Sequence, residues 1–130
     1  MKRDMDLVRD LLFYFEEKPG TEMVRGEDIK VDGRDDITVN HHLTLMYQAG
    51  LLTAETVVSS TTSERIIYVI PFELTWKGHE FLETVRDPEI WRRAKANGKA
   101  AGTASIEFIW SIAKALILTG VKEKTGLDLA

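Results

Sequence analysis

The chain has 130 residues, of which 44% are apolar and 29% are charged, and this suits one ordinary folded domain with a core. It contains no cysteine, which excludes disulfides, thiolate catalysis and cysteine zinc sites and agrees with a reducing cytoplasm. The net charge of −4 gives no global attraction for nucleic acid.

Charge and hydropathy are both unevenly distributed along the chain. Residues 1–85 hold 9 Lys and Arg against 16 Asp and Glu, whereas residues 86–130 hold 8 against 5, so a polyanion contact is more expected in the second part. The most hydrophobic stretch, residues 106–121, contains Glu107 and Lys114 and is shorter than the ~20 residues of a membrane span. The N-terminus lacks the apolar run of a signal peptide. We therefore expect a cytoplasmic protein without a membrane segment.

The first predicted element is a helix over residues 3–17. One of its faces carries apolar residues at spacings of three and four, namely Met5, Val8, Leu12 and Phe15. Pro19-Gly20 ends this helix. Residues 21–34 are predicted to hold a short strand or extended segment, because the second helix of an ordinary helix-turn-helix has no convincing signal there.

A second helix is predicted from Asp35 or Asp36, either of which can cap it, to Ala49-Gly50. Its inward stripe consists of Val39, Leu43 and Met46. His42 is expected to be partly buried against the hairpin that follows.

Two strands rich in Val, Ile, Thr and Tyr are predicted at residues 53–59 and 64–74, joined by a polar tip. Pro71 cannot donate a ladder hydrogen bond, so it is expected at an edge or a bulge. Thr75 then caps a helix that reaches about Val85, in which Trp76 is available for burial.

The remaining residues are predicted to form further helices. Pro88 opens a short basic helix, Asn97-Gly98 breaks it, and an apolar helix follows. The predicted segments are a core at residues 1–86, a short basic helix at 87–98, a linker at 99–103, an apolar helix at 104–120 and a flexible tail at 121–130.

This order of elements predicts an α+β fold of the winged-helix type, helix–strand–helix–β-hairpin–helix, with additional C-terminal helices. The local sequences agree with it. Residues 49–52, AGLL, are similar to the end of a recognition helix in bacterial winged-helix regulators. Residues 74–78, LTWKG, are similar to the LTxxG that leaves the wing, where Thr75 caps a helix and Gly78 permits close packing.

Together with the opening residues 1–9, these motifs resemble a family of short bacterial and prophage proteins of unknown function, close to the YjcQ type. The resemblance covers roughly residues 1–95. It implies the winged-helix fold and a phage or mobile-element setting in a bacterial host. It implies no activity, because none is established for that family, and no catalytic residues are carried over.

The outward face of the helix at residues 35–49 is the first candidate contact surface. Its polar residues are Thr38, Asn40, His41, Thr44 and Gln48, and the wing adds only Arg65, whose charge is offset by Glu64. Asn and Gln can read adenine, and Thr can meet a thymine methyl group. However, this helix has no Lys or Arg and begins with two aspartates, whereas phosphate contacts need cations. A solvated polar face is therefore the alternative.

The second candidate surface is basic and lies in residues 86–99. Its candidate contacts are Arg92, Arg93, Lys95 and Lys99, which could bind a phosphate or an acidic protein. The alternative is a solvated helix end, where cations also interact favourably with the helix dipole.

The last helix carries a wide apolar surface that must be buried against something. Its candidate oligomer contacts are Ile109, Trp110, Ile112 and Leu116. Packing on its own domain and a homodimer or partner interface are equally compatible with the pattern.

No motif predicts catalysis or a cofactor. His41 and His42 are adjacent and point about 100° apart on a helix, so they cannot chelate one metal ion together. The serines of the hairpin tip lack a G-x-S-x-G context, and there is no phosphate-binding glycine loop. We expect no enzyme, no metal, no cofactor and no small-molecule substrate. The two candidate functions are a DNA-binding, regulator-like winged-helix protein and a protein-interaction module of the same fold without DNA affinity.

Overall fold

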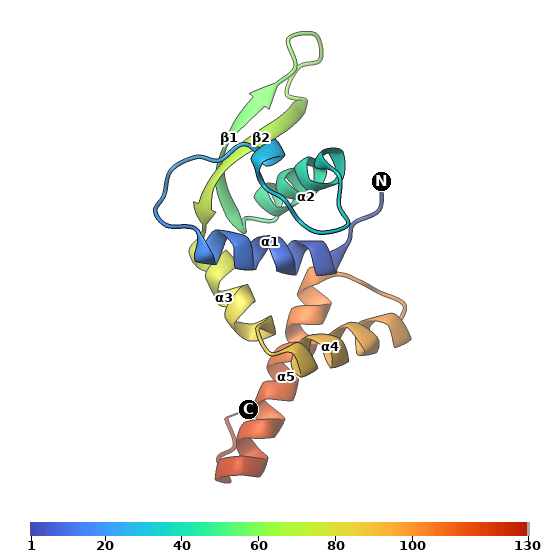
Figure 1. Ribbon diagram of the computed structural model, residues 1–130. Coiled ribbons are helices and arrows are strands. Elements are labelled where there is room, and N and C mark those ends of the chain that lie inside the picture. The colour runs from blue at the N-terminus through green and yellow to red at the C-terminus, as the bar shows by residue number, and fades with distance from the viewer. Residues whose placement is uncertain (130) are drawn as a thin grey trace. The chain divides into compact units, whose positions relative to one another are not determined.

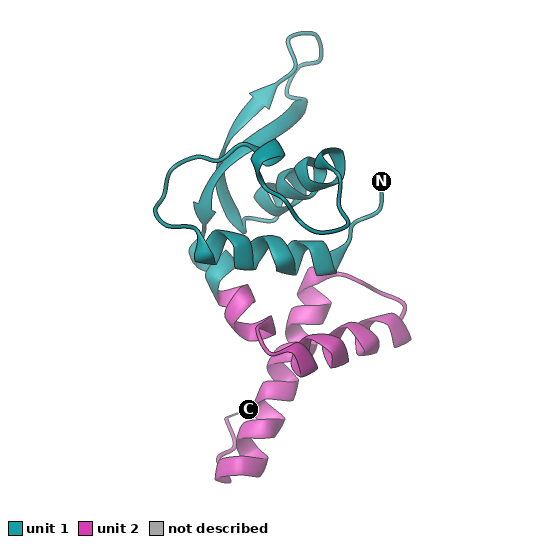
Figure 2. Cartoon of the chain, in the orientation of Figure 1, with its two compact units in different colours: residues 1–79 teal, residues 80–130 magenta. Residues whose placement is uncertain are grey.

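The computed structural model describes residues 1–129, and the chain divides into two compact units, residues 1–79 and residues 80–130 (Figure 2). The described residues form five α-helices, one short 3-10 helix and one antiparallel hairpin, so the predicted α+β class is confirmed (Figure 1). The elements in chain order are α1 (Met5–Glu17), η1 (Gly26–Asp28), α2 (Asp36–Gln48), β1 (Leu52–Val58), β2 (Ile66–Leu74), α3 (Trp76–Val85), α4 (Pro88–Ala100) and α5 (Ile106–Thr125).

The core of the first unit lies where α1, α2 and the hairpin pack against one another. The predicted inward stripes of α1 and α2 are buried, and so are Val69 of β2 and Ile29. Each such side chain contributes about 1.5–3 kcal/mol when it leaves water, so this contact is the main stabilising interaction of the unit.

His42 joins α2 to the start of α1 and is fully buried. The backbone N–H of Asp4 donates to its Nε2 atom at 2.7 Å, so Nε2 carries no proton, and Nδ1–H donates to the Thr38 carbonyl at 2.8 Å. His42 is therefore buried completely rather than partly, and its ring nitrogens are bound to the N-terminal cap of α1 and to the preceding turn of α2.

The hairpin pairs β1 with β2 in an antiparallel ladder that contains two register shifts. One shift places Ala54 opposite Pro71 and skips Phe72, so the prediction of a bulge near Pro71 is confirmed.

Of the two predictions for residues 21–34, a short strand or an extended segment, the strand does not form, whereas Arg25 and Ile29 on either side of η1 have extended backbone. A single hydrogen bond, from the Val24 N–H to the Pro71 carbonyl at 3.0 Å, joins this segment to β2. Pro71 has no N–H to return a second bond, so the ladder cannot extend there. The chain turns instead into the short 3-10 helix η1.

The two motifs that suggested a wing, residues 49–52 and residues 74–78, lie in direct contact. The Thr75 hydroxyl donates to the Gly50 carbonyl at 2.5 Å, and its backbone N–H donates to the Leu51 carbonyl at 3.0 Å. The hydroxyl also accepts the Gly78 N–H, which caps α3. A Cβ atom at Gly78 would lie 2.3 Å from the Leu51 carbonyl oxygen, so glycine is required for this close approach.

The exposure of Trp76 differs from the sequence-based expectation. This side chain follows the Thr75 cap at the first position of α3 and is 81% exposed rather than buried.

The second unit is held by contacts of α5 with α4 and with the C-terminal part of α3. Two predicted boundaries differ from the structure. Gly98 does not break α4; it is buried inside the helix, where a Cβ atom would lie 2.8 Å from the Thr103 carbonyl oxygen. Residues 121–125, expected in the tail, continue α5, which ends at Gly126 with a positive φ of 74°.

Candidate functional site

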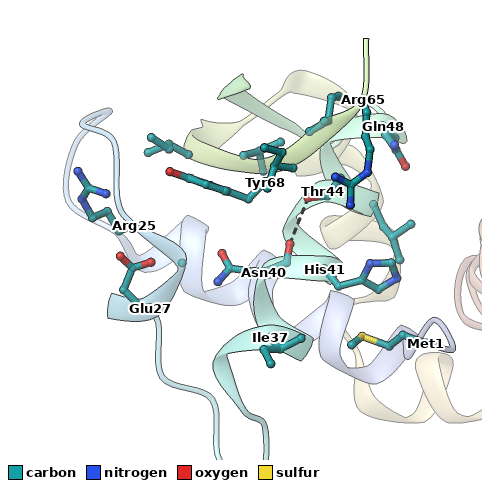
Figure 3. Close-up of a pocket in the computed structure, with 16 residues that line it drawn as sticks. Met1, Arg25, Glu27, Ile37, Asn40, His41, Thr44, Gln48, Arg65 and Tyr68 are labelled. Atoms are coloured by element: carbon teal, nitrogen blue, oxygen red, sulfur yellow. Dashed lines mark hydrogen bonds between the residues drawn. The ribbon is translucent and has the colours of Figure 1, made fainter. Parts of the chain in front are cut away.

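A groove of about 710 Å³ lies in the first unit between α2, β2 and the η1 turn (Figure 3). It brings together residues that are far apart in the sequence. Five of the six predicted contacts of α2 and the wing line it, namely Asn40, His41, Thr44, Gln48 and Arg65. The structure therefore gathers these side chains around a single concave surface.

The helical spacing of α2 explains this arrangement. Residues 37, 41, 44 and 48 follow one another at steps of three or four, so they lie along one face, opposite the buried stripe. Thr38 is the predicted contact that does not line the groove. Its backbone N–H donates to the Asp35 carboxylate at 2.8 Å, and its carbonyl accepts from His42, so it belongs to the helix cap.

Asn40 lies in the middle of the groove and rests on Gly26 of η1. A Cβ atom at Gly26 would lie 1.9 Å from the Asn40 Oδ1 atom, so only glycine leaves room for this amide. The Thr44 hydroxyl donates to the Asn40 carbonyl at 3.2 Å, as the dashed line in Figure 3 shows. Both side chains are thus positioned by local contacts.

Two arginines lie at opposite ends of the groove, with Arg25 beside Glu27 and Arg65 beside Gln48 (Figure 3). Within residues 1–129, neither guanidinium makes a hydrogen bond or an ion pair. Arg34 of the same unit is, by contrast, paired with Asp4 at 2.6 Å. Arg25 was missed in the sequence because nothing in the segment before η1 indicates that it lies near α2.

The acidic start of α2 is less repulsive than the sequence suggests. Lys30 pairs with Asp36 at 3.1 Å and partly neutralises it. Hydrogen bonds from the Thr38 side chain, and then from its backbone N–H, lower the pKa of Asp35, so this carboxylate stays ionised as the N-cap.

Apolar side chains are exposed along the same groove. Ile37 of α2 is 72% exposed, Ile67 of β2 is 50% exposed and Tyr68 of β2 is 37% exposed. The groove therefore combines a cation at each end, the Glu27 carboxylate beside Arg25, amides and a hydroxyl on α2, and apolar and aromatic surface between the ends.

The sequence family described as Hypothetical protein (DUF2513) matches residues 2–104. The chain belongs to the DUF2513 family. A relative from the bacterium Haemophilus influenzae, described as an uncharacterized protein, is 32% identical over 121 residues, which is 90% of this chain and 96% of the relative. No solved structure matches the chain. The prediction that the chain belongs to a family of uncharacterised proteins is therefore confirmed.

The DUF2513 match includes α4 and every residue that lines the groove except Met1, and it ends before α5. The predicted basic contacts lie on α4, in the second unit. Arg92 makes two hydrogen bonds to Glu89, which raise the pKa of the guanidinium and lower the pKa of the Glu89 carboxyl. Lys95 lies over the Trp91 ring, with its Nζ atom 5.3 Å from the ring centroid. Arg93 and Lys99 are exposed.

The predicted oligomer contacts of this DUF2513 protein divide into two pairs. Ile109 is buried, and Trp110 packs on the Phe81 ring and donates its Nε1–H to the Thr84 hydroxyl at 3.2 Å. Ile112 and Leu116 are only half-buried. Ile109 and Trp110 therefore hold α5 within its own unit, whereas the half-buried Trp110, Ile112 and Leu116 retain some surface for another chain.

Two further findings concern residues 1–129. No helix in that range combines the length and the apolar character that crossing a membrane requires. No group of three or more His, Asp or Glu side chains in it is arranged to hold a metal ion.

Proposed function

We propose that this DUF2513 protein is a DNA-binding protein of the winged-helix type, regulator-like and associated with a phage or mobile element in a bacterial host. In this proposal α2 is the recognition helix and the hairpin is the wing. The single hydrogen bond of Val24 to β2 corresponds to the short strand, and η1 replaces the second helix. The resemblance to the YjcQ type agrees with this arrangement.

The observation that carries the proposal is the pair of unpaired arginines beside the polar face of α2. The electrostatic difficulty in the sequence was the absence of cations on that helix. Arg25, which has Glu27 beside it, and Arg65 supply cations from two neighbouring segments. Asn40 lies between them and Gln48 lies beside Arg65, and both have amides that can bind base edges.

The test is binding of labelled mixed-sequence DNA to the full chain, measured by fluorescence anisotropy over a range of salt concentrations. With two phosphate contacts, we expect log K to fall against log salt with a slope of about −2, because each contact contributes about −0.9 in duplex DNA. Arg25→Ala and Arg65→Ala are each expected to reduce the slope by about 1.

Lys18→Ala is the matched control, because it removes one positive charge from the same unit and does not line the groove. It should leave the slope within error of the wild type. If DNA does not bind at low salt, or if the two arginine variants behave like Lys18→Ala, the proposal is wrong.

A second candidate function is a protein-interaction module that uses the same groove. The observation in its favour is the exposure of Ile37 and Ile67, because duplex DNA needs no such surface. Residues 1–79 also hold 9 Lys and Arg against 14 Asp and Glu, a net charge of −5. Under this alternative, Ile37→Ser removes partner binding, whereas Arg25→Ala and Arg65→Ala do not change the binding of DNA.

A further inference from the structure

The cations of the groove follow a single path. Arg25 lies at one end and Arg65 at the other, while α2 between them carries no Lys or Arg (Figure 3). Duplex DNA presents two rows of phosphates, and tight duplex binding depends on many contacts to them. A single strand presents one row, which two cations at the ends of one groove can follow.

Between the arginines, the groove exposes surface that suits the faces of bases. Tyr68 is 37% exposed, and Ile67 beside it is 50% exposed. In a duplex the base faces are stacked on one another, and proteins reach mainly the base edges. In a single strand the faces are open and stack on aromatic side chains.

We infer that the groove binds a single strand of DNA, with phosphates at Arg25 and Arg65 and a base against the Tyr68 ring. The amides of Asn40 and Gln48 bind the edges of the stacked bases. The groove has a volume of about 710 Å³. This inference deepens the proposed function and rests on it.

The test compares a labelled mixed-sequence strand of about 16 nucleotides, the upper end of the site size of one single-strand-binding module, with the duplex of the same sequence. We expect the full chain to bind the strand at least about tenfold more tightly than the duplex, because one stacked base contributes roughly that factor. Equal or tighter binding of the duplex overturns the inference and leaves the proposed function intact. Binding of neither form overturns both.

Substitution of Tyr68 supplies a second readout. Tyr68→Ala is expected to weaken strand binding about tenfold and to change duplex binding little, whereas Tyr68→Phe keeps the ring and the affinity. Trp76→Ala is the matched control, because it removes a more exposed aromatic ring that does not line the groove. Equal strand affinities of Tyr68→Ala and Trp76→Ala overturn the inference. Thermal melting of each variant checks that it is folded, and Tyr68→Phe retains the packing if the alanine variant does not fold.

Discussion

At the scale of single residues, one glycine positions a central side chain of the groove. Gly26 is buried, and the Asn40 amide occupies the space that a Cβ atom would need. The sequence identified Asn40 as an outward-facing residue of α2, but it contained no signal that a glycine 14 positions earlier would contact it. The contact depends on the path of the chain through η1.

Gly26→Ala tests this contact. We expect a loss of about 1–3 kcal/mol in the free energy of unfolding, since the new methyl group overpacks against Asn40 and displaces it from the groove. In an Asn40→Ala background the same substitution should cost much less, because the clashing atoms are gone. Urea unfolding of the wild type, Gly26→Ala, Asn40→Ala and the double variant measures the coupling free energy between the two positions. Additive changes in the free energy of unfolding would show that Gly26 and Asn40 do not share this space.

The burial of His42 is a second case, which the sequence predicted only in part. A histidine at the edge of the apolar stripe was expected against the hairpin. Its ring is fully buried because both nitrogens are satisfied, one by the Asp4 N–H and one by the Thr38 carbonyl. Periodicity indicates which face a residue occupies, but not which partner satisfies its polar atoms.

At the scale of elements, α2 is the helix on which the site depends, and its boundaries were predicted from local signals. Asp35 caps its start, and Gly50 takes a φ of 77° after its end. Both signals act within one helical turn, so they need no tertiary structure. The same holds for the Pro71 bulge, because proline itself removes the hydrogen-bond donor.

The Asp35 cap predicts a pH dependence of stability. Hydrogen bonding lowers its pKa in the folded state below the ordinary value of 3.8. The stabilisation is therefore complete above the unfolded value and is lost as the pH falls through the lower folded value. Melting temperatures of wild type and Asp35→Ala should differ at neutral pH and converge below pH 3.8.

Asp32→Ala serves as its control, since it removes the same charge from the turn that precedes α2. A difference between wild type and Asp35→Ala that persists unchanged into strong acid would contradict the role of the ionised cap.

At the scale of the whole molecule, the chain consists of two units with different charge. Residues 80–130 hold 8 Lys and Arg against 7 Asp and Glu, so the charge of −4 arises mainly from residues 1–79. The second unit has its own packed contact of α4 and α5, around Ile109 and Gly98.

Substitutions in α5 separate packing from association. Ile109→Ala removes a buried side chain and is expected to lower the free energy of unfolding by about 2–4 kcal/mol. Leu116→Ala, at a half-buried position, should cost less. Sedimentation measures whether Leu116→Ala alters the mass of the species in solution. A mass equal to a single chain for both wild type and variant would remove the homodimer prediction.

The sequence by itself determined the α+β class, α1, α2, the hairpin and the identity of five residues that line the groove. These follow from hydrophobic periodicity, capping residues and β-branched runs, all of which act over a few neighbouring residues. Only the tertiary structure decided that Arg25 and Arg65 lie at the two ends of one groove, that Gly26 supports Asn40 and that α5 uses Ile109 and Trp110 within its own unit. Each of these depends on contacts between segments far apart along the chain, for which no local pattern exists in a single sequence.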